Sequence, residues 1–186
     1  PEGRLGARRQ GFGGGSESTI AEISTLLKRA NELAISGANA TTDQQGRDAM
    51  ASELTEIQKR LVDLGNSKGA NEQYLFSGQK TDTQPFVVSG SGLSYQGDNK
   101  DLTAEISPNS SMTYNVQLGT LLTNTYTQLE TLKNDLQGCN TGAISGVDLT
   151  NVQAAIKSFD QVRGTIGTSI QAADQAIDHH QRRMDD

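Results

Sequence analysis

The side chains best suited to chemistry lie near the end of the chain. His179 and His180 are its only histidines, and Asp178 and Asp185 flank them. Adjacent residues of a helix point about 100° apart, so the two imidazoles are poorly placed to bind one metal ion. The four side chains offer at most a weak surface cluster. We therefore expect a solvated helix end and no metal site.

A single thiol and a glycine-rich segment are the other candidates. Cys139 is the only cysteine, and no histidine lies near it in the sequence to activate it as a nucleophile. The segment GFGGG at 11–15 has the glycine content of a phosphate loop, but it lacks a preceding strand and a following Lys-Ser/Thr pair. We expect a bystander thiol, no cofactor and no catalytic residues. The chain is therefore predicted not to be an enzyme.

Charge and hydropathy exclude further classes of function. The formal charge is −6, although the first fifteen residues are basic. An acidic body argues against binding nucleic acid. No apolar run approaches the roughly 20 residues that cross a bilayer, and no classical signal peptide opens the chain. We interpret residues 1–15 as a flexible tail, either added by an expression vector or a native basic arm.

The elements that carry these side chains have helical periodicity. Apolar residues recur at alternating steps of three and four, which predicts packed helices at 19–37, 43–69, 118–137 and 150–184. Capping signals of the type Thr-x-x-Glu/Gln stand at Thr19, Thr41 and Thr150. The glycine-rich stretch between the last two helices, which contains Cys139, is predicted to be a mobile loop.

The apolar positions of these helices define one predicted packing seam. Its residues are Ile20, Ile23, Leu27, Met50, Leu54, Ile57, Leu61, Leu64, Leu129, Leu132, Leu136, Ile156, Phe159, Ile166, Ile170 and Ile177. The last helix would span roughly 50 Å, too long for a compact domain of this size. We therefore expect an elongated molecule, and we expect the natural helix to continue past Asp186. Gly164 and Gly167 inside this helix permit close approach of another helix, a bend, or neither.

The segment 77–117 has a different pattern. The runs FVV, LSY, LTAEI and MTYNV, separated by Pro85 and by glycines, predict short strands joined by turns. The predicted fold class is mainly α with a β-rich insertion (α+β). The domains would be the tail at 1–15, a discontinuous helical rod at 16–76 and 118–186, and an insertion domain at 77–117.

One motif carries a resemblance to a known family. The segment NEQYLFSGQKTDTQPF at 71–86 is similar to the junction motif of the flagellar hook-filament junction proteins, the family of flagellar hook-associated protein 3. Stretches at 21–39, 94–99 and 162–177 agree with the same family, which is related to the flagellins. The residues of the motif are Tyr74, Leu75, Phe76, Ser77, Gly78, Thr81, Asp82, Pro85 and Phe86.

The resemblance implies a flagellin-like rod of four helices with a small β outer domain, lacking the terminal coiled-coil segments of the family. It implies a structural subunit that connects the hook to the filament through self-assembly, without cofactor or enzymatic activity. Its partners would be copies of itself in a ring, the hook-side hook-associated protein, flagellin and a cytoplasmic export chaperone, with no nucleic acid and no membrane. The fragment itself would be monomeric. The protein would be extracellular, at the flagellar hook-filament junction, after type III export without a cleaved signal peptide.

Two other interpretations remain at this point. Flagellin itself has similar helices, but differs where the helical core enters the outer domain. A signalling coiled-coil module would share the periodicity, but such modules lack a β-rich insertion between helical hairpins. The motif at 71–86 therefore favours the junction proteins.

Overall fold

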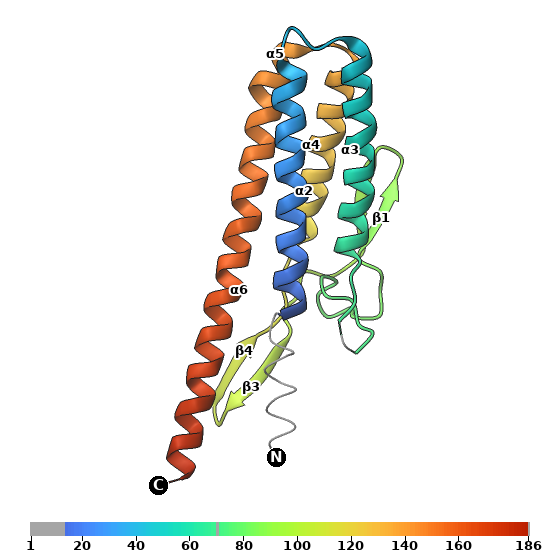
Figure 1. Ribbon diagram of the computed structural model, residues 1–186. Helices are drawn as coiled ribbons and strands as arrows, with labels where there is room; N and C mark the ends of the chain where they lie inside the picture. The colour runs from blue at the N-terminus through green and yellow to red at the C-terminus, as the bar shows by residue number, and fades with distance from the viewer. Residues whose placement is uncertain (1–13, 70, 186) are drawn as a thin grey trace.

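Four long helices form an elongated bundle in the computed structural model, which describes residues 14–69 and 71–185. The helices are α2 (Gly14–Ala38), α3 (Gln44–Gly65), α4 (Gly119–Gln137) and α6 (Leu149–Met184). Helix α2 packs along α6 and α3 packs along α4, while α6 extends well beyond the others (Figure 1). The predicted fold class, an elongated helical rod with a β-rich insertion, is confirmed.

The interior of the bundle is one cluster of apolar side chains drawn from all four helices. Steps of three and four residues keep an apolar side chain on the same face at every turn, so each helix turns one stripe inward. The seam residues that are buried are Ile20, Ile23, Leu27, Leu54, Ile57, Leu61, Leu64, Leu129, Leu132, Leu136, Phe159, Ile166 and Ile177. Met50, Ile156 and Ile170 are half-buried against the cluster, and Ile177 lies outside it.

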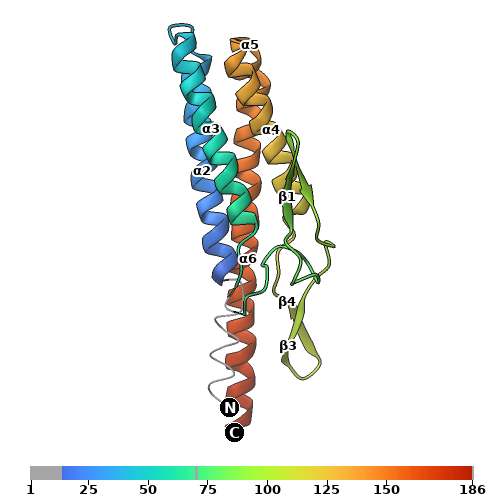
Figure 2. The same ribbon diagram turned by 90° about the vertical axis from the view of Figure 1, so that its right-hand side faces the viewer.

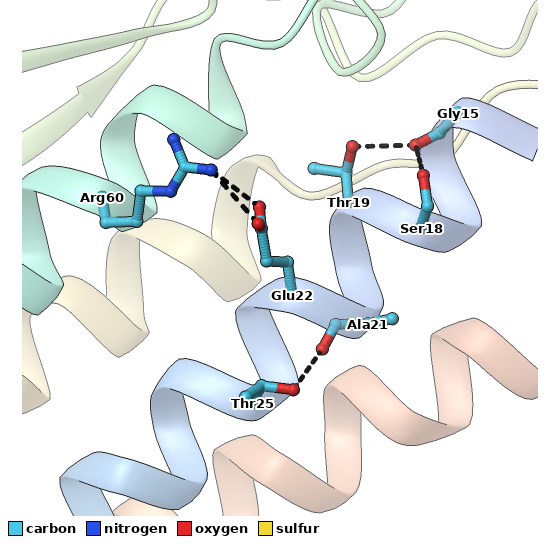
Figure 3. A network of polar contacts seen from close by, with 7 residues as sticks. All are labelled: Gly15, Ser18, Thr19, Ala21, Glu22, Thr25 and Arg60. Carbon is cyan, nitrogen blue, oxygen red and sulfur yellow. Dashed lines mark hydrogen bonds and ion pairs between the residues drawn. The ribbon is translucent and has the colours of Figure 1, made fainter.

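Helix α2 begins earlier than its capping signal predicted. Gly14 and Gly15 are already helical, so the predicted tail lies outside the described residues except for these two. Thr19 is an interior residue whose hydroxyl donates to the Gly15 carbonyl at 2.8 Å, and Glu22 accepts from the Arg60 guanidinium of α3 at 3.0 and 3.2 Å (Figure 3). The capping box predicted here is wrong because both side chains have other partners.

Helix α3 is capped by a neighbour of the predicted residue. The Asp43 carboxylate accepts from the Gly46 backbone N–H at 2.8 Å, whereas the Thr41 hydroxyl donates to the Asn39 side chain at 2.9 Å. An ionised carboxylate at this position satisfies one of the free N–H groups of the first turn. The helix ends at Gly65, four residues before the predicted end at 69.

The predicted mobile loop before α6 is also wrong. Only a short turn separates α4 from the helical turn α5 (Thr141–Ala143), which continues as the π-helix η1 (Ile144–Asp148) directly into α6. Thr150 is therefore not a cap, and its hydroxyl donates to the Gly146 carbonyl one turn earlier at 2.8 Å. Glycine and serine gave this segment the composition of a loop, but its helical turns are held by packing against α2 and α4.

The insertion consists of two separate antiparallel hairpins. Strands β1 (Phe86–Ser89) and β2 (Gly92–Tyr95) form one, and β3 (Thr103–Ser107) and β4 (Ser110–Thr113) form the other. The first hairpin packs on α3 and α4, whereas β3 contacts α6 further along the rod (Figure 2). The predicted strand in MTYNV ends at Thr113.

The two hairpins share no sheet, and the first contributes Phe86 to the core cluster of the helices. The predicted division into a rod and an insertion domain at 77–117 stays a prediction. What the structure adds is that the first hairpin is joined to the rod through buried side chains.

Candidate functional site

The segment that joins α3 to the first hairpin contains the motif at 71–86, and its geometry starts at Asn66. The Asn66 side chain donates to the Phe86 carbonyl at 2.8 Å and accepts from the Phe86 N–H at 2.9 Å. This pair of bonds imitates a rung of an antiparallel sheet and ties the end of α3 to the start of β1. Gly65 lets the end of α3 and the start of β1 approach closely, because a Cβ at this position would lie 2.6 Å from Leu122 and 2.7 Å from the Phe86 ring.

Three aromatic side chains pack where the hairpin meets the helices. Phe76 and Phe86 are fully buried, and the Tyr95 ring lies 5.2 Å from the Phe86 ring, centroid to centroid. The Tyr95 hydroxyl donates to the Phe76 carbonyl at 2.9 Å, so the polar end of a half-buried ring is satisfied. Burial raises the pKa of Tyr95, which keeps this hydroxyl a donor at neutral pH. The contacts link both ends of the motif to β2.

A tight turn after Phe76 depends on a glycine and an aspartate. Gly78 has φ of +67°, and a Cβ there would collide with the Asp98 carboxylate. That carboxylate accepts from the backbone N–H groups of Gln79 at 2.9 Å and Lys100 at 3.1 Å. Burial opposes ionisation of Asp98, but these N–H groups outweigh it and hold the pKa below its ordinary value. The turn is therefore fixed by a charged side chain from the segment after β2.

Two other motif residues, Tyr74 and Pro85, also make contacts that fix the backbone. Tyr74 is half-buried under the Lys68 ammonium, 4.9 Å from its ring centroid, and its N–H donates to the Thr81 carbonyl at 2.9 Å. Pro85 is buried and its carbonyl accepts from the Gln96 N–H at 2.7 Å. Leu75 is half-buried, Ser77 is buried and Asp82 is exposed. The contacts of Tyr74 and Pro85 help to hold the chain between α3 and the hairpin in place.

Three residues of this junction were missed as site residues. Asn66 follows a glycine at the end of a periodic segment, which is a recognisable helix-end signal, but its partner Phe86 lies twenty residues away. Tyr95 and Asp98 belong to the stretch 94–99 noted for its resemblance, yet their roles depend on contacts with Phe76 and Gly78 that no local pattern shows.

The residues singled out for chemistry are not brought together. Cys139 is exposed at the end of α4, while His179 and His180 lie on the last turns of α6, beside Pro108 of the second hairpin. Within residues 14–69 and 71–185, no group of three or more histidine, cysteine, aspartate or glutamate side chains is arranged to hold a metal ion. No helix in the described part of the chain is long and apolar enough to span a membrane.

Comparison with known proteins supports the resemblance seen in the sequence, although no family model matches the chain. Flagellar hook-associated protein 3 of Salmonella typhimurium is 31% identical over 90 residues, which is 48% of this chain and 28% of that protein. Its Escherichia coli counterpart is 30% identical over 70 residues, 38% of this chain and 22% of that protein. The matches thus span less than a third of these relatives.

Solved structures of flagellar proteins share the fold. A putative flagellar hook-associated protein from Vibrio parahaemolyticus has a TM-score of 0.88 at 18% identity, covering 98% of this chain and 84% of that one. Hook-associated protein 3 from Legionella pneumophila has a TM-score of 0.84 at 13% identity, covering 95% and 91%. Flagellin from Bacillus cereus has a TM-score of 0.63 at 15% identity, covering 92% and 85%. The fold is flagellin-like, and the resemblance to hook-associated protein 3 is confirmed.

Proposed function

We propose that this chain is the core of a flagellar junction subunit, which connects the hook to the flagellin filament by self-assembly and catalyses no reaction. The sequence match to two proteins named flagellar hook-associated protein 3 is the observation that carries this proposal. The shared fold is consistent with it, but the fold also occurs in flagellin.

The segment that joins α3 to the first hairpin, called the junction segment below, has a geometry that suits an assembly subunit. The side chain of Asn66 bonds the backbone of the motif to the end of α3, while Tyr95 and Asp98 bond it to β2 and to the segment that follows. A subunit that must match several neighbours at once gains from surfaces held in fixed positions, because less conformational entropy is lost on association. The family motif would then act by positioning the hairpins, while the contacts between subunits lie elsewhere on the surface.

The partners would be copies of the same protein in a ring, the hook-side hook-associated protein and flagellin. A cytoplasmic chaperone would accompany the chain to the type III export apparatus, and the protein would act outside the cell without removal of a signal peptide. The chain described here would be monomeric by itself.

Deleting the gene tests the proposed role. A junction subunit is required for filament growth, so mutant cells should carry hooks without filaments and release flagellin into the medium. Restoring the gene on a plasmid should restore filaments. Normal filaments in the deletion strain would refute the role. Loss of the filament with no flagellin of any kind in the medium would instead favour the alternative, that the chain is itself a flagellin.

Analytical ultracentrifugation tests the monomer proposal. The chain at micromolar concentration should sediment as a species of its own mass, 19.8 kDa. A stable oligomer under these conditions would contradict the proposal, independently of the outcome in cells.

A further inference from the structure

One acidic side chain occupies a position that the helix periodicity reserves for apolar residues. The buried face of η1 and the first part of α6 consists of Ile144, Asp148, Val152, Ala155 and Phe159. Asp148 is only 2% exposed. A carboxylate at such a position loses its hydration, and burial of an unpaired charge is strongly unfavourable. Some interaction must therefore offset the cost of burying the Asp148 carboxyl group.

The surroundings of Asp148 lack a hydrogen-bond donor for one of its oxygens. Its Oδ2 atom is buried and has no hydrogen-bond partner. The neighbouring group that acts on this carboxyl is itself a carboxyl, that of Asp135 on α4, the helix against which η1 packs. Two ionised carboxylates cannot donate to each other. One proton between them supplies the missing donor and removes one of two like charges.

The π-helix places Asp148 at this contact. Residues 144, 148 and 152 follow at two consecutive steps of four, and the wider π turn keeps all three on the buried face. Asp135 is half-buried near the end of α4, where its Oδ1 accepts from the Asn140 side chain at 3.2 Å. The pair thus joins η1 to α4 at the end of the rod opposite the described C-terminal end of α6 (Figure 1).

No cation neutralises the buried carboxyl within the described part of the chain. The charged side chains on the adjoining parts of the helices packed against η1 are Lys28, Arg29 and Glu32 of α2, Glu130, Lys133 and Asp135 of α4, and Lys157 and Asp160 of α6. Arg29 pairs with Glu32 and Glu53, and Lys133 pairs with Glu130 at 2.8 Å. Among the described residues only Asp135 shifts the titration of Asp148.

We propose that Asp135 and Asp148 bind one proton between them, and that this shared proton holds η1 against α4 and makes the end of the rod sensitive to pH. This inference rests on the burial of Asp148, on its unpartnered Oδ2 atom and on the packing of η1 against α4, and it is independent of the proposed flagellar role. Burial, followed by the neighbouring Asp135, raises the pKa of Asp148 to about 7 from its ordinary value of 3.8. The folded chain therefore binds more protons than the unfolded chain between these values, and its stability falls as the pH rises from about 4 to about 7.

Direct titration of the chain tests the proposal without any substitution. Carboxyl carbons of aspartate are followed by NMR from pH 3 to pH 9 in labelled protein. One resonance assigned to Asp135 or Asp148 should titrate with a midpoint near neutrality. If both carboxyl groups titrate below pH 5, the proposal is wrong. Because the unmodified protein is used, the result does not depend on whether a variant folds.

Thermal unfolding of two variants tests the consequence. The Tm of the parent should fall by several degrees between pH 5 and pH 8. Asp148→Asn supplies an amide donor in place of the shared proton, so the Tm of this variant should not show that fall. Asp63→Asn removes an exposed carboxylate of α3 and serves as a matched control that keeps this fall. The proposal would be overturned if Asp148→Asn retained the same pH dependence as Asp63→Asn.

Discussion

Replacing Asn66 by alanine tests whether the junction segment depends on the pair of bonds to Phe86. The substitution removes the acceptor of the buried Phe86 N–H and one of two donors to its carbonyl, since Gln84 Nε2 still donates to that carbonyl at 3.1 Å. A buried donor left without a partner costs about 1–3 kcal/mol, and the carbonyl loses less. We expect the free energy of unfolding to fall by about 2 kcal/mol.

Urea unfolding followed by far-UV circular dichroism measures this change, with the midpoint shifted and the slope unchanged. Asn124→Ala is the matched control, because Asn124 is exposed on α4 and alanine favours a helix more than asparagine does. The control should show no loss of stability. If Asn66→Ala falls within about 0.5 kcal/mol of the parent, the range expected of an ordinary surface substitution, the two bonds do not stabilise the junction.

Three further predictions concern glycines and a surface ion pair. A Cβ at Gly164 or Gly167 would meet no atom within 4 Å, so the double alanine variant should gain about 1 kcal/mol per site in urea unfolding, and a loss would show that the helix needs these glycines. Gly65→Ala should instead lose about 1–3 kcal/mol in the same assay, because its Cβ would overlap Leu122 and Phe86; an unchanged midpoint would mean that the core yields there. The hydrogen bond from Arg29 lowers the pKa of Glu53, so this pair contributes stability at neutral pH that is lost as the pH falls below about 4.5, the ordinary value of the carboxyl. Glu53→Gln should therefore cost a small amount at neutral pH that vanishes at high salt, and a salt-independent loss would contradict an ionic origin.

The helices could be predicted from the sequence because their burial is periodic. Leu54, Ile57 and Leu61 recur at steps of three and four, which only a helix turns to one side, and the structure buries all three. This signal is local, since it needs no knowledge of which helix is the partner. The ends of the helices carried less information. Thr19 and Thr150 have the residue type of a cap, but a hydroxyl can equally donate to a carbonyl one turn earlier, as both do here.

The motif of the junction segment could be recognised in the sequence, but the conformation of the segment could not be predicted from it. Its turns depend on contacts between residues that lie far apart along the chain, such as Gly78 with Asp98 and Phe76 with Tyr95. Composition indicated strands and turns at 77–117, and the strands are present, but nothing local shows that the first hairpin lies on α3 and α4 while the second lies on α6. The resemblance supplied the identity of the motif, and the long-range contacts explain why these residue types are needed.

Asp148 shows what periodicity can reveal when it is extended beyond an assumed boundary. Once the seam of α6 is continued backwards from Val152, the next inward positions are 148 and 144, and the segment becomes a helix with one charged residue on its buried face. Because the glycines at 142 and 146 were interpreted as part of a loop, the buried position of Asp148 was not predicted. A Cβ at either glycine would meet no atom within 4 Å, so close packing does not require glycine there. Glycine there weakens the helix without preventing it, because packing of Ile144 against the core compensates for part of the lost propensity. The same weakness makes the end of the rod a place where the loss of one proton can have a structural effect. A regular α-helix with an apolar residue at 148 would be more stable, and it would lack the pH response that Asp148 contributes.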